Sequence, residues 1–168
     1  MNLDPKMLAQ EGNGAVQVDE SPDHCPLIVT LVGPIKVWWS EWDSPRHQEY
    51  TQWRDAVRVA LVHAGCAVYS PHRAIQGSWN EKLQYINDRA IEVSDIVIVL
   101  TPPGVPADGT AGEIEVARKN KVYIIECPPD GPDTIEKLLG TIKIFAEEKA
   151  AIEKQLSDIE KTSYSFPK

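Results

Sequence analysis

The sequence predicts an α/β fold: a single-domain, Rossmann-like or flavodoxin-like parallel sheet with helices on both faces and a long C-terminal helix. Two observations support this prediction. Apolar runs of strand length alternate with longer stretches of helical period through residues 27–168. The total length of 168 residues fits one domain. We therefore expect one domain with one hydrophobic core over residues 27–168.

The first 26 residues differ from the rest. They carry Gly, Pro, Asp, Glu and Ser without any hydrophobic periodicity. Such a segment cannot bury enough apolar surface to fold by itself. Residues 1–26 are therefore predicted to form a flexible N-terminal arm.

Four apolar runs have the length of strands. They are residues 27–32, 67–70, 96–101 and 122–125. Each reads as a strand that is buried on both faces, as strands of a parallel sheet are when helices cover both sides.

Two helices are predicted between these strands. The first has apolar residues at spacings of three and four from Tyr50 to Ala64, and Gly65 follows where a C-terminal cap belongs. The second carries an apolar stripe that falls within an arc of about 80° and is therefore predicted to face the core. The stripe consists of Trp79, Leu83, Ile86, Ala90 and Val93.

Two more helices follow. A short one comes after Thr110, and a long polar one covers residues 133–160. The long helix has a heptad-like stripe, which consists of Ile135, Leu138, Ile142, Phe145, Lys149, Ile152 and Leu156. One small sheet cannot cover so long a stripe. The helix therefore indicates packing against a second subunit, and we expect a homo-oligomer.

Composition restricts the class of partner. The formal charge of −8 argues against a nucleic-acid polymer, because polymer binding requires Lys and Arg to neutralise phosphates. No apolar run approaches the roughly 20 residues of a membrane span, and the N-terminus lacks the pattern of a secretory signal. We expect a cytoplasmic protein that does not bind membranes. Cys25, Cys66 and Cys127 lack metal-ligand spacing, so buried thiols are expected and no metal site.

The candidate site lies after the third strand. In open parallel sheets, ligands bind outside the carboxyl ends of the strands. There Asp108, Gly109 and Thr110 turn directly into a helix whose first turn contains Glu113. Backbone N–H groups of such a turn point at an anion or a hydroxyl. The same residues also fit a capping box, in which Thr110 and Glu113 bond to each other's backbone, so the two interpretations compete.

Four segments together resemble a known family. They are LVGPI at the first strand, VYSPHR at the second, IEVSDIVIVL at the third and PGVPADGTAGEIEVA after it. Their order and spacing are similar to those of the nucleoside 2-deoxyribosyltransferase superfamily, which includes deoxyribosyltransferases and nucleoside 5'-monophosphate N-glycosidases. The VY-x-x-HR and GT-x-x-EI pieces look most like cytidine-monophosphate hydrolases.

The resemblance implies a chemistry. A Glu at the position of Glu113 forms a glycosyl ester and then passes the sugar to water or to another base. No cofactor is implied, the partner is a small nucleoside or nucleotide, and neighbouring subunits often complete the pocket. A carboxylate can trap an oxocarbenium-like centre in this way, so the residue type fits.

One position departs from the family. Relatives carry a carboxylate eight residues before the Asp that opens the third strand, and counting back from Asp95 gives Asn87. A second acidic or hydrogen-bonding group is still needed for the leaving base. Asn87, the adjacent Asp88 and Asp108 remain open candidates for it.

The substrate-binding candidates follow the strand ends. Gly33 and Lys36 come after the first strand, where Lys36 either contacts the substrate or is a solvated surface residue. His72 and Arg73 come after the second, where they either hold a phosphate or hydroxyl or form a salt bridge at the sheet edge. In the third segment, Gly109 and Thr110 are candidates. Three nearby tryptophans either form a lid, stack on the base or belong to an oligomer interface, namely Trp38, Trp39 and Trp42.

Two other functions compete with a glycosyl enzyme. A non-catalytic nucleotide-binding or sensing module would keep the fold and lose the acid function, as Asn87 suggests. A flavodoxin-like electron carrier is disfavoured, because no Ser/Thr-rich phosphate loop follows the first strand.

Overall fold

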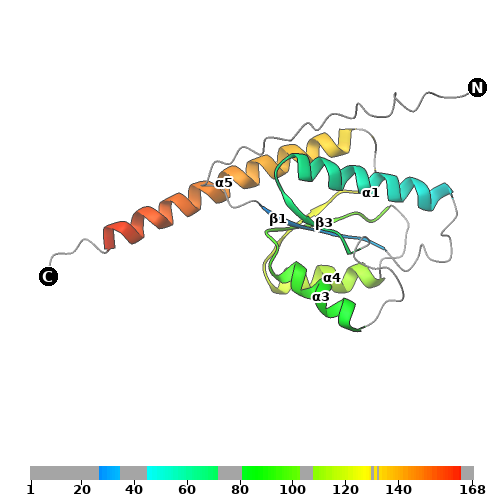
Figure 1. Ribbon diagram of the computed structural model, residues 1–168, viewed down its shortest axis with the longest axis horizontal. Coiled ribbons are helices and arrows are strands. Elements are labelled where there is room, and N and C mark those ends of the chain that lie inside the picture. The colour runs from blue at the N-terminus through cyan, green and yellow to red at the C-terminus, as the bar shows by residue number, and fades with distance from the viewer. Residues whose placement is uncertain are drawn as a thin grey trace, which may run out of the picture.

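The chain folds into a four-stranded parallel sheet with helices on both sides (Figure 1). The computed structural model describes residues 27–34, 45–71, 81–102, 108–129, 131 and 133–163. The strands are β1 (Ile28–Val32), β2 (Ala67–Tyr69), β3 (Ile96–Val99) and β4 (Tyr123–Glu126), in the order β2-β1-β3-β4. All three pairings are parallel. The predicted α/β fold is confirmed.

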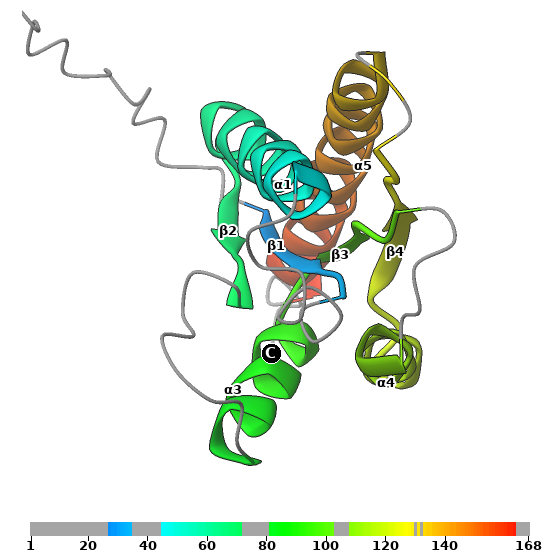
Figure 2. The same ribbon diagram turned by 90° about the vertical axis from the view of Figure 1, so that its right-hand side faces the viewer.

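The helices form one layer on each face of the sheet. Helices α1 (Pro45–His63) and α5 (Asp133–Ser163) cover one face, and α3 (Glu81–Glu92) and α4 (Asp108–Lys119) cover the other (Figures 1 and 2). Alternate residues of β3 point to opposite faces. Ile96 and Ile98 therefore pack in the core under α1 and α5, whereas Val97 and Val99 pack in the core under α3 and α4.

The two edge strands correct one prediction. We expected all four strands to be buried on both faces, but only β1 and β3 are nearly so. Residues of β2 and β4 are half-buried or exposed, and Tyr123 of β4 is exposed. The reason is their place in the sheet, since an edge strand has a neighbour on one side only. An apolar run in the sequence does not tell a central strand from an edge strand.

Helix α1 ends as its sequence predicts. Gly65 has a φ of +85°, a left-handed conformation that costs little without a side chain. Its N–H donates to the carbonyl of Val62, and the N–H of Cys66 donates to that of Leu61, both at 3.0 Å. These two bonds form a Schellman motif.

Helix α3 is rotated relative to our prediction. Ile86 and Val93, which the apolar stripe placed in the core, are 50% and 65% exposed. The side chains of Asn87 and Ile91 are buried instead. Polar contacts accompany this orientation: Asn87 bonds to a residue of α4, and Ser94 Oγ lies 2.7 Å from Thr30 Oγ1 of β1. A hydrophobic pattern in the sequence does not predict that a polar residue such as Asn87 is buried, because its burial depends on a hydrogen-bond partner in the core. Trp79 lies outside the described residues.

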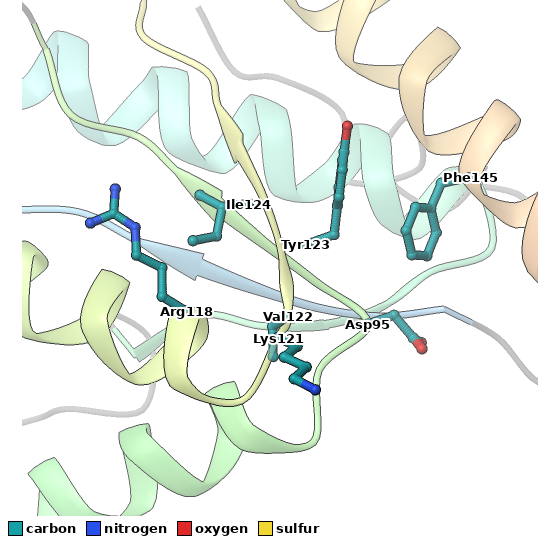
Figure 3. A pocket seen from close by; sticks show the side chains of 7 residues that line it. All are labelled: Asp95, Arg118, Lys121, Val122, Tyr123, Ile124 and Phe145. Carbon is teal, nitrogen blue, oxygen red and sulfur yellow. The ribbon is translucent and has the colours of Figure 1, made fainter.

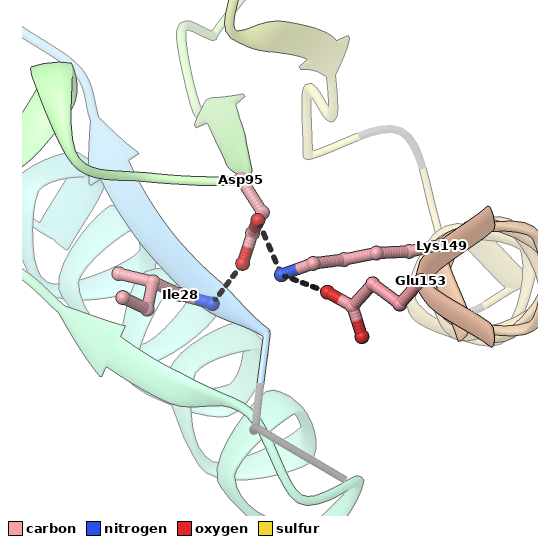
Figure 4. A network of polar contacts seen from close by, with 4 residues as sticks. All are labelled: Ile28, Asp95, Lys149 and Glu153. Carbon is pink, nitrogen blue, oxygen red and sulfur yellow. Dashed lines mark hydrogen bonds and ion pairs between the residues drawn. The ribbon is translucent and has the colours of Figure 1, made fainter. Parts of the chain in front are cut away.

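The first half of α5 is held against the sheet by an ion pair. Lys149 Nζ lies 2.7 Å from Asp95 Oδ1, and the other oxygen of Asp95 accepts a hydrogen bond from the backbone N–H of Ile28 (Figure 4). The C-terminal part of the helix extends past the sheet (Figure 1). Three of its apolar residues there are more than half exposed, namely Ile152, Leu156 and Ile159.

Two further observations concern the sequence-based expectations. Cys66 and Cys127 are buried free thiols, as predicted, and Cys25 lies outside the described residues. Within the described ranges, none of the helices combines the length and the apolar composition that a bilayer crossing needs.

Candidate active site

The candidate site lies where the central strands end. Strands β1 and β3 finish side by side, with Val32 paired to Val99, and α4 begins after β3 at Asp108. The second turn of α4 carries Glu113, and the neighbouring helix α3 carries Asn87. Both side chains are buried, with 4% of Glu113 and none of Asn87 exposed. The fold thus brings together two candidates from different predicted helices.

Asn87 and Glu113 form a direct hydrogen bond. Nδ2 of Asn87 donates to Oε1 of Glu113. The other atom of each group, Asn87 Oδ1 and Glu113 Oε2, is buried and has no hydrogen-bond partner in the part of the chain that the structure describes. The hydroxyls of Thr110 and Ser70 share this property. Buried polar atoms usually have partners, so the two unsatisfied atoms of the bonded pair Asn87 and Glu113 are typical of a site that binds a polar ligand.

The capping-box interpretation of Thr110 and Glu113 is not supported by the contacts. Helix α4 already begins at Asp108, so Thr110 lies inside the first turn rather than before it. Its Oγ1 has no hydrogen-bond partner among the residues that the structure describes, and Oε1 of Glu113 bonds to Asn87 rather than to the backbone of Thr110. Neither bond of a capping box is therefore present between these two residues.

The environment of Glu113 makes its carboxyl a weaker acid than an exposed carboxyl group. Burial raises the pKa of Glu113 to about 7, because a desolvated carboxylate is less stable than the neutral acid. The hydrogen bond from Asn87 lowers this pKa, and the negative charge of Asp88 raises it. Near neutral pH the group therefore exists in both protonation states.

Two tyrosines that the sequence did not single out for the site lie near this carboxylate. Burial raises the pKa of Tyr50; the charge of Arg54 lowers it and that of Glu113 raises it. Burial, followed by the charge of Glu113, also raises the pKa of Tyr69. Tyr69 is the last residue of β2 and so lies at the carboxyl edge of the sheet, where open parallel sheets generally bind ligands, a signal that was present in the sequence. Tyr50 was assigned to the core stripe of α1, where it is indeed buried.

Gly33 has a structural reason for lacking a side chain. A Cβ at this position would collide with the hydroxyl oxygen of Tyr50 and would lie 3.4 Å from the carbonyl oxygen of Leu100. The absence of a side chain at Gly33 therefore allows the hydroxyl of Tyr50 to lie against the end of β1. This close approach was not foreseen, since the sequence suggested Gly33 only as a substrate contact.

The remaining candidates fall into two groups. Among the described residues, Asp88 accepts a hydrogen bond of 2.7 Å from Gln84 on its own helix, and Gly109 is exposed in the first turn of α4. Asp108 is the first residue of α4, but its side chain lies outside the described part of the structure. Entirely outside it are Lys36, His72, Arg73, Trp38, Trp39 and Trp42.

A separate cleft lies at the opposite edge of the sheet. It has a volume of about 490 Å³ and includes Asp95 before β3 and Val122 before β4, at the amino ends of the strands (Figure 3). Arg118 and Lys121 supply positive charge, and Tyr123 and Phe145 line it with aromatic rings. Because Glu113 lies towards the carboxyl ends of the strands, this cleft is not the candidate active site.

No protein-family model matches the chain, and no curated protein matches it in sequence. Among the described residues, no three His, Cys, Asp or Glu side chains are grouped so that they could hold a metal ion.

Proposed function

We propose that this protein cleaves the N-glycosidic bond of a nucleoside or nucleoside 5'-monophosphate through a covalent glycosyl-Glu113 intermediate. One observation supports the proposal most strongly. Glu113 presents a buried carboxylate near the carboxyl edge of a parallel sheet, with Oε1 held by Asn87 and Oε2 without a hydrogen bond from the described residues. An ionised carboxylate with one oxygen fixed and the other available is suited to attack an anomeric carbon.

The reaction has two steps. In the first, Oε2 of Glu113 forms a bond to C1' of the sugar, and the bond between C1' and the base nitrogen breaks with its electron pair going to the base. In the second, water attacks C1', the ester bond breaks, and the carboxylate of Glu113 is regenerated while the proton of the water is released. A second base attacks instead of water if the enzyme is a transferase. Two displacements at C1' give net retention.

Asn87 holds the nucleophile in this scheme. Its Nδ2 donates a hydrogen bond to the carboxylate, and the same amide, turned over, accepts a hydrogen bond at Oδ1 from the neutral carboxyl, so one amide can serve both states of a group whose pKa is about 7. An amide does not release a proton at physiological pH, so Asn87 does not protonate the leaving base. Asp88 and Asp108 remain the candidates for that step.

Position 87 is an amide and not a carboxylate, and this favours the second candidate function, a non-catalytic nucleotide-binding or sensing module. Such a module would bind the ligand at the same edge without breaking the glycosidic bond. In both cases His72 and Arg73, which follow β2, are proposed to contact a phosphate or hydroxyl of the ligand.

One experiment separates the two functions. The protein is incubated with pooled nucleosides and nucleoside 5'-monophosphates, with and without a free acceptor base, and the released and exchanged bases are measured by liquid chromatography. We expect base release that Glu113→Gln abolishes and that Asn120→Ala, an exposed position at the end of α4, leaves unchanged. Binding without base release or exchange would instead establish the sensing module.

A further inference from the structure

In the side-chain amide of Asn87, the nitrogen forms a hydrogen bond and the oxygen has no hydrogen-bond partner among the described residues. No part of its side chain is exposed, Nδ2 donates to Glu113, and Oδ1 accepts no hydrogen bond from any described residue. A buried amide oxygen without a donor is unfavourable. This residue therefore favours a ligand that brings a donor to Oδ1.

We propose that Asn87 selects ribosyl over 2'-deoxyribosyl substrates by accepting a hydrogen bond from the 2'-hydroxyl of the sugar. The inference rests on the proposed function, in which Oε2 of Glu113 attacks C1'. It concerns which sugar the site prefers, not whether the glycosidic bond is cleaved.

The connectivity of the pair places the two open atoms in one region. Oε1 and Oε2 of Glu113 share a carbon, Nδ2 and Oδ1 of Asn87 share another, and a hydrogen bond joins Oε1 to Nδ2. Oδ1 of Asn87 and Oε2 of Glu113, the atom proposed to bond to C1', are therefore linked through a single hydrogen bond between their two side chains. The 2'-hydroxyl is carried by the carbon next to C1', so it is the sugar hydroxyl closest to the new bond. The 3'- and 5'-hydroxyls lie further along the sugar.

The chemistry of the open atoms also fits a hydroxyl. An ionised Glu113 and the amide oxygen of Asn87 are both acceptors, so the ligand must supply donors. Once Oε2 is bonded to C1', only Oδ1 still needs one. A 2'-deoxyribose carries C–H bonds at this place and leaves the amide oxygen unsatisfied, whereas a ribose satisfies it.

The hydrogen bond should act mainly in the transition state. Contacts to the 2-hydroxyl of a sugar strengthen as the oxocarbenium-like centre develops. Loss of a donor to a buried acceptor then lowers kcat/KM by about tenfold to a hundredfold. We therefore expect kcat/KM to be about tenfold to a hundredfold higher for ribonucleotides than for their 2'-deoxy counterparts.

The test compares matched sugars in matched variants. Base release is measured for the 5'-monophosphates of adenosine, guanosine, cytidine and uridine and for their 2'-deoxy forms. The variants are Asn87→Leu, which removes donor and acceptor at similar volume, Asn87→Asp, which keeps an acceptor, and Asn120→Ala as a control on the surface. The ribose preference should fall close to one in Asn87→Leu and persist in Asn87→Asp and in the control. Thermal unfolding confirms that each variant folds.

Each result has a defined meaning. A purely structural Asn87 would slow both sugars equally and leave their ratio unchanged in Asn87→Leu, which contradicts the inference. Equal kcat/KM for both sugars in the unaltered protein, or a preference for 2'-deoxyribose, also contradicts it without any variant, while base release still supports the proposed function. No base release from any of the eight nucleotides, nor from the corresponding nucleosides, overturns the proposed function and this inference with it.

Discussion

At Glu113, burial and hydrogen bonding act in opposite directions. Burial destabilises the carboxylate, and the single bond from Asn87 only partly restores it, so the pKa is raised to about 7. A carboxyl group that served only the fold would be better satisfied at the surface or with a full set of partners. Strongly perturbed groups of this kind are concentrated at functional sites.

The first prediction concerns Glu113→Gln. If Glu113 is the nucleophile, the variant loses its anion, and kcat should fall by at least about a thousandfold while the protein still folds and binds the nucleotide. Steady-state kinetics and a binding titration measure the two effects separately. If Glu113 only packs, the amide should retain full activity.

A covalent intermediate can also be sought directly. A 2-fluoro sugar substrate slows breakdown of the glycosyl ester more than its formation, so an adduct should accumulate. Mass spectrometry of the digested protein should locate the adduct on the peptide that contains Glu113. An adduct on a different peptide would assign the nucleophile elsewhere.

The second prediction follows from the raised pKa. The attacking form of Glu113 is the carboxylate, so kcat/KM should increase with pH through about 7 and then level off. Asn87→Asp places a second carboxyl beside the first and should move this transition to higher pH, because two like charges oppose ionisation. A pH profile of kcat/KM that is flat between 5 and 9 in the unaltered protein would contradict an ionised Glu113 as nucleophile.

The third prediction concerns stability. The pKa of Glu113 is higher in the folded protein than in the unfolded chain, so the folded state binds the proton more tightly. The stabilisation is complete below pH 4.5, the ordinary value, and is lost as the pH rises through about 7. The loss amounts to about 3 kcal/mol at most. Urea unfolding should therefore show equal stability of the protein and Glu113→Gln near pH 4.5 and a more stable variant near pH 8.5.

At the level of secondary-structure elements, β1 and α1 meet through one close contact. Tyr50 of α1 reaches Gly33 at the end of β1, where there is no room for a Cβ beside the tyrosine hydroxyl. The same tyrosine is affected by the charge of Glu113. Packing between α1 and β1 is thus linked to the candidate site.

The fourth prediction tests this contact. Gly33→Ala should destabilise the fold by about 1 to 3 kcal/mol, because the added methyl group collides with the Tyr50 hydroxyl. Tyr50→Phe removes the colliding oxygen, and the added Cβ would then lie 3.6 Å from the nearest ring carbon, Cζ. The double variant should therefore be no less stable than Tyr50→Phe alone. Urea unfolding of the four proteins measures the coupling. Additive losses would show that Gly33 is required for another reason.

The elements differ in how far the sequence reveals them. The strands and α1 could be predicted because continuous apolar runs, helical spacing and Gly65 are local signals. The orientation of α3 could not, because it depends on Asn87 meeting Glu113 of another helix. For the site, the pattern around Glu113 was visible, but the place of Asn87 in the core and the approach of Tyr50 to Gly33 depend on long-range packing.

At the level of the whole molecule, the two edges of the sheet have different properties. Glu113 lies towards the carboxyl ends of the strands, whereas α5 passes Asp95 at the amino end of β3 and continues beyond the sheet. The exposed Ile152, Leu156 and Ile159 follow Leu138, Ile142 and Phe145 in the same heptad-like spacing. The face of α5 that packs on the sheet therefore continues into a face that the described residues leave uncovered.

The last prediction is that this continued face joins two copies of the chain. A symmetric pair would let each copy cover the apolar residues of the other, as isologous interfaces do. Sedimentation velocity at micromolar concentration should show a dimer or a larger homo-oligomer, and Leu156→Lys should shift it towards the monomer by placing a charge in the contact. Lys154→Ala, about half a helical turn away in angle from Leu156, is the matched control and should sediment like the unaltered protein. Because this end of α5 is remote from Glu113, the Leu156→Lys monomer should keep its activity per subunit unless a different contact brings a neighbouring subunit to the pocket. An unaltered protein that sediments as a monomer would remove the proposed role of the exposed stripe.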